Sequence, residues 1–256
     1  ANTDVQVLTG TLTIDSSNGS GSNELSDASN LSLGNGSTFE LTGDQDFVLG
    51  DIANVNSTGL DMTAGNDDTP TFDASDFSGD LEAGIQREQN ASGGNNTQTI
   101  ELGSGDDTVV VEQADGGSAD EFTFVFSGDS IGSDVISGQD DGDTDANPGF
   151  DSTSGGGNDT EGNVDDVLEF AQIGSTGDGT PGDSLSITGD TTGTNDGDSI
   201  TVEDDGNGDA LVDVTLVNSG NDAEVTASGD QFDGSITITG VGNLADFDAN
   251  NFAFTG

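Results

Sequence analysis

The chain has 256 residues, of which 51 are acidic and only one, Arg87, is basic. This length suffices for one large or two medium domains with a real hydrophobic core. The absence of Cys excludes disulfides and thiolate metal sites, and the absence of His removes the commonest transition-metal ligand and general base. The net charge of −50 excludes nucleic acid and anionic membranes as partners by its sign.

The apolar residues are few, but they are ordered along the chain. A hydrophobic content of 29% with this charge is typical of disordered proteins. Here the apolar residues form short alternating runs, such as residues 122–126 (FTFVF) and 236–238 (ITI). Alternation with a period of two indicates strands joined by short polar connections, and it predicts an all-β protein. No apolar run reaches membrane-spanning length, so we expect no membrane insertion.

One short sequence pattern recurs in the first half of the chain. Residues 1–15 (ANTDVQVLTGTLTID) predict one or two strands, and from residue 31 to 130 an apolar strand followed by a small-Gly-acid turn recurs. The interval is roughly twenty residues, the length expected of one turn of a β-solenoid. We therefore expect a β-solenoid or β-roll with Asp-Gly turns. A β-sandwich, with the pattern at every second strand, is the alternative.

Helix is expected to be nearly absent. Residues 80–89 (DLEAGIQREQ) form the one window with several helix formers, and Gly84 interrupts it, so at most a short turn is expected there. Residues 245–251 could form another turn. Residues 138–163 are almost free of apolar residues and predict an acidic linker or a cation-ordered loop. This divides the chain into an N-terminal β domain, 1–137, and a C-terminal β domain, 164–256.

Residues 100–111 (IELGSGDDTVVV) resemble the calcium-binding nonapeptide of the repeats-in-toxin family, G-G-x-G-x-D-x-U-x. Gly103, Gly105, Asp107 and Val109 match its second Gly, third Gly, Asp and U positions, whereas Leu102 stands where the first Gly should be. Residues 234–254 resemble the segment that closes many such proteins. The resemblance implies an exported β-protein stabilised by Ca²⁺, of the sort found in bacterial surface layers, adhesins and secreted enzymes.

The resemblance also implies a first calcium site at residues 103–107. In a β-roll, backbone carbonyls of this turn and Asp107, beside Asp106, would coordinate the ion, and Gly103 and Gly105 would permit left-handed backbone conformations. The alternative is a solvated turn.

Three other acidic stretches have spacings that suit a hard cation. Their residues are Asp205, Asn207 and Asp209 (D-x-N-x-D); Asp141, Asp143 and Asp145 (D-x-D-x-D); and a looser group of Asp159, Asp165 and Asp166. The first spacing matches the opening half of an EF-hand loop, although the rest of that loop does not follow. A hairpin turn is the alternative for that stretch.

The acids themselves favour chelation over simple solvation. The chain has 40 Asp and 11 Glu, and the Asp lie beside Gly and Asn. The short Asp side chain suits tight chelating turns, whereas an acidic surface adapted to high salt can use Glu equally well. Because acidic clusters have no base to neutralise them, we expect several bound Ca²⁺ ions. The alternative interpretation is that Asp, Asn and Gly occur here simply as turn residues.

These observations predict a non-enzymatic protein. Without His or Lys, catalysis would need carboxylate pairs or an unassisted hydroxyl nucleophile. A chain that begins at Ala fits a processed exported protein, although an artificial boundary would look the same. We expect an extracellular, cell-surface structural protein that self-assembles into a surface layer (S-layer) or filament, with strand exchange through residues 4–14. The alternatives are a monomeric Ca²⁺-stabilised adhesin or binding module, and a halophile surface protein stabilised by bulk salt.

Overall fold

The computed structural model describes residues 5–7, 10–17, 21–29, 31–34, 36–62, 69–86, 97–112, 121–127, 130–138, 166–171, 185–189, 193–204, 211–227, 233–241, 243–247 and 251–255. In these ranges the protein is mostly β with almost no helix: α1 spans Val55–Thr58 and the 3₁₀ turn η1 spans Leu244–Asp246. No helix in this part of the chain is long and apolar enough to cross a membrane.

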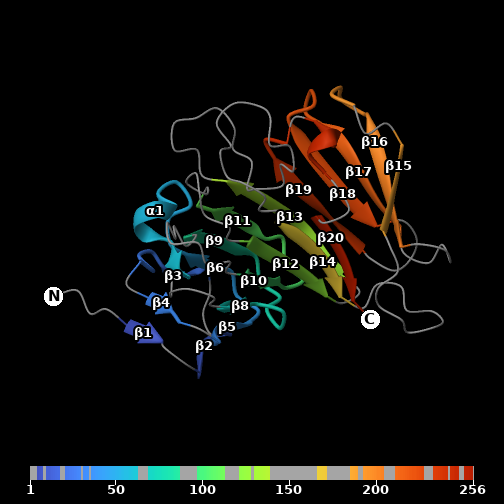
Figure 1. The fold of residues 1–256 in the computed structure, drawn as a ribbon. Coiled ribbons are helices and arrows are strands. Elements are labelled where there is room, and N and C mark those ends of the chain that lie inside the picture. Colours follow the sequence, from blue (N-terminus) through green and yellow to red (C-terminus); the bar gives the residue numbers. More distant parts are fainter. Residues whose placement is uncertain are drawn as a thin grey trace, which may run out of the picture.

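Seven strands form one fully parallel sheet, sheet B, in the order β2-β5-β8-β10-β12-β14-β20 (Figure 1). Their bounds are β2 Gly10–Ser16, β5 Ser37–Gly43, β8 Thr71–Asp73, β10 Thr97–Leu102, β12 Glu121–Ser127, β14 Val167–Ala171 and β20 Phe252–Thr255. In register, Leu12 pairs with Phe39, and Phe39 with Phe72. Each strand therefore places the same kind of residue on the same face as its neighbour.

Thirteen strands form the second sheet, sheet A, in the main order β1-β4-β7-β9-β11-β13-β19-β18-β17-β16-β15, with β3 and β6 branching from β9. Their bounds are β1 Val5–Val7, β3 Asn23–Leu25, β4 Leu31–Leu33, β6 Phe47–Leu49, β7 Leu60–Asp61, β9 Leu81–Gln86, β11 Thr108–Val111, β13 Ser130–Gly138, β15 Leu185–Gly189, β16 Ser199–Asp204, β17 Leu211–Val217, β18 Asp222–Ala227 and β19 Asp233–Thr239. The pairs from β1 to β19 are parallel, and those from β19 to β15 are antiparallel.

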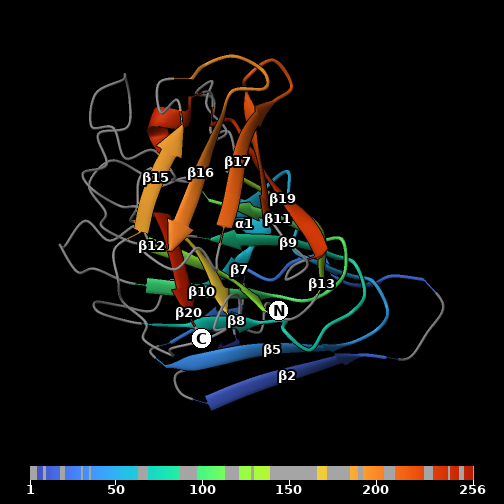
Figure 2. The same cartoon turned by 90° about the vertical axis from the view of Figure 1, so that its right-hand side faces the viewer.

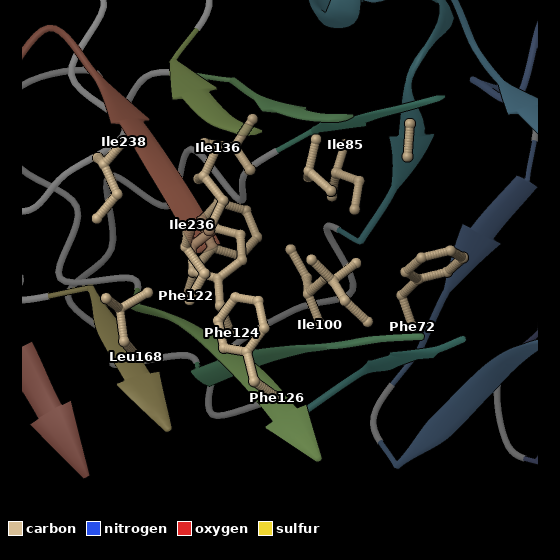
Figure 3. Packing of buried hydrophobic residues seen from close by; sticks show 14 of the residues in the cluster. Phe72, Ile85, Ile100, Phe122, Phe124, Phe126, Ile136, Leu168, Ile236 and Ile238 are labelled. Carbon is tan, nitrogen blue, oxygen red and sulfur yellow. The ribbon is translucent and has the colours of Figure 1, made fainter. Parts of the chain in front are cut away.

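The core lies between the two sheets, because strands of sheets A and B alternate through much of the chain. From sheet B, buried rings such as Phe72 and Phe124 point towards buried aliphatic residues of sheet A such as Ile85 and Ile136 (Figure 3). Stacked rings continue the row at one end, where Phe126 and Phe170 lie 5.8 Å apart between centroids and Phe170 and Phe254 lie 5.6 Å apart.

The expected fold class is wrong. A β-solenoid or β-roll with turns of roughly twenty residues requires uniform parallel repeats, whereas sheet A joins a parallel part to an antiparallel extension, β15–β18. The spacing is unequal as well, since Ile100 pairs with Phe124 but Phe124 with Leu168 and Leu168 with Phe252. The alternative β-sandwich is also wrong, because such sandwiches consist of antiparallel sheets and sheet B is wholly parallel.

The antiparallel extension follows from local turn chemistry. Between β17 and β18 the chain reverses at Asn218, Ser219 and Gly220, all with positive φ, and such a reversal joins adjacent strands into a hairpin. Figure 2 shows β15, β16 and β17 as upright strands above the nearly horizontal strands β5 and β2 of the parallel stack.

The described part of the window 80–89, which ends at residue 86, contains no helical turn. Residues Leu81–Gln86 form strand β9 instead, in which Leu81, Ala83 and Ile85 alternate into the core. Gly84 has a packing role on the other face, where an added Cβ would lie 3.2 Å from Val55 Cγ2 of α1. In the stretch 245–251, part of η1 is present at its start. Strands from both sides of the expected linker 138–163 share both sheets, since β19 pairs with β13 and β14 with β12.

Candidate cation-binding turns

Three turns that lead from sheet B to sheet A, residues 43–47, 77–81 and 103–108, lie on top of one another and on the first part of β13, residues 130–135. We call these four segments the turn stack. Backbone hydrogen bonds join successive members. Phe47 N donates to Asp80 O at 2.9 Å, Ser104 N to Phe77 O at 3.1 Å, and Val135 N to Asp107 O at 2.8 Å. The parallel strands on either side therefore hold these acidic turns in a fixed row.

Glycines let the turns approach this closely. A Cβ on Gly103 would lie 2.0 Å from Phe77 O, one on Gly105 would lie 2.1 Å from Gly79 O, and one on Gly132 would lie 1.9 Å from Gly105 O. Contacts this short are impossible for a real side chain, so only glycine fits. Gly103 and Gly105 were expected to permit left-handed backbone conformations. That expectation is wrong, because neither glycine has a positive φ.

Exposed carboxylates form the outer row of the turn stack: Asp46, Asp80 and Asp106. Each one accepts a hydrogen bond through Oδ1 from a backbone N–H of the following segment of the turn stack. Asp80 N donates to Asp46 at 3.3 Å, Asp106 N to Asp80 at 3.0 Å, and Ser133 N to Asp106 at 3.0 Å. Because parallel neighbours lie about 4.8 Å apart, this row holds negative charges at close, regular spacing.

Two buried carboxyls, Asp107 and Asp134, form the inner row. Each is 1% exposed. Oδ1 of Asp107 accepts a 3.0 Å hydrogen bond from Leu81 N, and Oδ1 of Asp134 accepts one of the same length from Asp107 N. The Oδ2 atoms of both residues are buried without a hydrogen-bond partner. Asp134 pairs in register with Ile236, so the residue that follows this row of acids in sheet A is apolar.

This environment favours the neutral carboxylic acid. Burial raises the pKa of Asp107 to about 7, against the opposing effect of the N–H groups of Leu81 and Gly103 and with reinforcement from Asp80 and Asp106. Burial likewise raises the pKa of Asp134 to about 8; the N–H of Asp107 opposes this shift, and the carboxylates of Asp107 and Asp106 add to it. A neutral acid can donate a proton from Oδ2, which an ionised one cannot.

Calcium ions take six to eight oxygen ligands, usually with several carboxylates. In the described ranges, no group of three acidic side chains is arranged so that it could hold a metal ion. The inner pair offers two free carboxyl oxygens in apolar surroundings, which does not fit a Ca²⁺ cage. The outer row is exposed and regularly spaced, and it suits cations that bind at the surface.

A second acidic row crosses the outward face of sheet B. Glu40 pairs with Asp73, and Asp73 with Glu101. Glu169 follows beyond Val125, and Thr13 Oγ1 donates to Glu40 Oε2 at 2.6 Å. Partial burial, followed by the neighbouring charges of Asp73 and Glu169, raises the pKa of Glu101.

Of the sequence-predicted residues, Gly103, Gly105, Asp106 and Asp107 lie together in one turn of the stack. Asp166 lies elsewhere, where its buried carboxyl accepts a 2.8 Å hydrogen bond from Phe122 N. The remaining predicted residues fall outside the described ranges: Asp141, Asp143, Asp145, Asp159, Asp165, Asp205, Asn207 and Asp209.

Sequence reasoning missed Asp46, Asp80 and Asp134. Each stands directly before an apolar residue, and the last two follow a Gly closely. Reading these Asp-apolar pairs as one recurring position would have found them. Comparison of the chain with protein-family models, with curated proteins and with solved structures finds no match in any of the three.

Proposed function

We propose that this chain is a non-enzymatic, exported structural protein whose copies assemble through an open end of the β-stack into an extracellular surface layer or filament. Divalent cations, Ca²⁺ first among them, lower the repulsion between the copies. The observation that carries this proposal is the edge of β2, the outermost strand of sheet B, which pairs with no other strand among the described residues.

The open end also has apolar residues that are incompletely covered. Leu12 and Ile14 of β2 are only partly buried, whereas Phe39 and Leu41, their partners in β5, are 0% exposed. A seven-residue edge strand with apolar residues on one face and no Lys or Pro is a ready template for another strand. Contact with a further copy would complete the burial.

Charge is the obstacle to such assembly. With a net charge of −50, neighbouring copies repel one another, and the outer row of the turn stack concentrates this repulsion. Cations that bind along Asp46, Asp80 and Asp106 would reduce both the repulsion within one copy and that between copies. The acidic stretches at 141–145 and 205–209 stay candidates for additional Ca²⁺ ions, by virtue of their spacing.

A monomeric Ca²⁺-stabilised binding module, such as an adhesin domain, is the second candidate. It is favoured by the other end of the stack, where Phe247 packs against Phe252 of β20 with ring centroids 5.8 Å apart and Phe252 is 3% exposed. A covered end is typical of a discrete domain. The third candidate, a halophile surface protein, requires bulk salt in place of specific ions.

Size-exclusion chromatography with light scattering, together with electron microscopy, separates the three. The structural proposal predicts large assemblies in millimolar Ca²⁺ that dissolve in EDTA at low salt. A compact monomer whose melting temperature rises in millimolar Ca²⁺ would instead support the binding module. A protein that melts at the same temperature with and without Ca²⁺, but is stabilised by molar KCl or NaCl, would support the halophile protein.

A further inference from the structure

The two ends of sheet B differ: in the described part of the chain β2 is an edge strand of seven residues, whereas the edge strand at the other end, β20, has four. All seven residues of β2 pair on one side with β5 in unbroken register. On its other side, β2 has no partner strand in the described part of the chain. Figure 1 shows β2 at one extreme of the stack and β20 near the other.

A second copy can cover this end most simply by presenting the same end. Head-to-tail growth would pair β2 with β20, which has only four residues to offer to the seven of β2 and carries Phe252 packed against Phe247. Two copies related by a two-fold axis need only one kind of surface, and such closed dimers are the commonest oligomers. The axis would place the two β2 strands antiparallel to each other. The B sheets of both copies would then lie on one side of the dimer and the A sheets on the other.

The sequence of β2 fixes the register of that pairing. If Thr13 lies opposite its own copy, Leu12 lies opposite Ile14 on the inner face, and Thr11 opposite Asp15 on the outer face. Apolar residues then meet apolar residues, and each carboxylate meets a hydroxyl donor rather than another acid.

Other registers lose these matches. Centring the pair on Leu12 places Ile14 opposite Gly10, and centring it on Ile14 places Leu12 opposite Ser16. Either shift leaves an apolar side chain beside a residue that cannot cover it.

We infer that this protein forms a two-fold dimer in which the β2 strands of two copies pair antiparallel about Thr13, joining the two B sheets into one. The dimer is the first contact of the assembly proposed above, so this inference rests on that proposed function. Its partner is a second copy of the same chain, recognised by backbone hydrogen bonds and by the contact between Leu12 and Ile14.

Cysteine cross-linking tests the register directly, because the chain has no Cys of its own. A Thr13→Cys variant is expected to give a disulfide dimer under mild oxidation. Thr11→Cys, on the same strand and face, is the matched control: it lies opposite Asp15, about 13 Å along the strand from its own copy. It should lose self-cross-linking and regain a cross-link when mixed with Asp15→Cys.

Leu12→Asp is expected to convert the dimer into monomer, whereas Ser26→Asp adds the same charge at an exposed position outside β2 and retains the dimer. Circular dichroism confirms that each variant is folded. Wild-type protein that is monomeric at all concentrations, or equal cross-linking of Thr11→Cys and Thr13→Cys, would overturn the interface. Assemblies that form in Ca²⁺ without Thr13→Cys cross-links would overturn the interface and leave the proposed function standing. Cross-linked dimers that never assemble further would support the interface and overturn the surface layer or filament.

Discussion

The backbone N–H of Asp107 donates a 3.0 Å hydrogen bond to Oδ1 of Asp134. The main chain of Asp107 therefore holds the buried carboxyl of Asp134 in place beside the buried carboxyl of Asp107 itself. Both carboxyls lie in the inner row of the turn stack, where their neighbours include Leu81 and Ile236. Two adjacent acids in apolar surroundings cannot both ionise without a large cost in free energy. The pH dependence of stability should report this arrangement.

We predict that the free energy of unfolding falls as the pH rises from about 4 to about 8. The pKa values of Asp107 and Asp134 are raised to about 7 and about 8 in the folded protein. Between the unfolded and folded pKa values the native state binds more protons, so stability decreases by up to about 1.4 kcal/mol per pH unit for each group. Urea denaturation followed across this range measures the slope.

Asp107→Asn and Asp134→Asn should flatten that slope and stabilise the protein at pH 8 without divalent ions, because an amide cannot ionise. Asp196→Asn, at an exposed position outside the turn stack, is the control and should leave the slope unchanged. If the Asn variants instead lose stability only in the presence of Ca²⁺, the inner pair binds the cation and the neutral-acid interpretation fails.

Gly105→Ala should destabilise the protein by about 1–3 kcal/mol, since overpacking against rigid atoms has a cost of that order. The new Cβ would lie 2.1 Å from the backbone oxygen of Gly79, so one turn of the stack must move. Ser104→Ala, in the same turn but exposed, should change stability by less than about 0.5 kcal/mol. Chemical denaturation of both variants is the measurement, and equal stability would contradict the close packing of the turns.

Replacing Asp80 and Asp106 by Asn should raise the melting temperature in low salt and reduce the further rise on adding Ca²⁺. Asn retains the Oδ1 acceptor used by the next turn but removes the charge. The pair Glu24→Gln and Asp196→Asn removes the same charge at exposed positions outside the turn stack. If both pairs respond equally to Ca²⁺, the outer row has no special affinity for cations.

Asp73→Asn should lower the pKa of Glu101, because it removes one of the two like charges that raise it. The remaining causes, partial burial and Glu169, stay in place, so the pKa should stay above its ordinary value. Carboxyl-detected NMR titration follows the group directly. Asp61→Asn, on sheet A, provides a control that should not shift the Glu101 titration.

Strands were predictable from this sequence because alternation is a local signal. The FTFVF and ITI runs are confirmed as parts of β12 and β19, and β1 and all but the last residue of β2 lie within residues 1–15. The short helical turn allowed for within residues 80–89 is not present in residues 80–86, which form a strand because Leu81, Ala83 and Ile85 alternate towards the core. Which strands pair with each other could not be predicted, because no local sequence feature indicates that Phe124 pairs with Leu168 across residues 128–166.

The candidate site was predictable only in part for the same reason. The Gly-rich turn at 103–107 can be recognised from its own sequence. Asp134 and Asp80 belong to the site only because their Oδ1 atoms accept hydrogen bonds from the backbone N–H groups of Asp107 and Asp106. Such contacts belong to the stacking of turns far apart in sequence. The burial that raises both pKa values is likewise a property of the assembled sheets.

The pairing of β20 with β14 sets the order in which this molecule can be completed. Leu168 pairs with Phe252, and the whole antiparallel extension lies between them in the sequence. Closing so long a loop is entropically expensive and slow. During synthesis, the stack therefore has a free edge at β14 until β20 has been made. A truncated chain that lacks residues 252–255 would keep Phe170 at an open edge, a point of attack for proteases and for other chains.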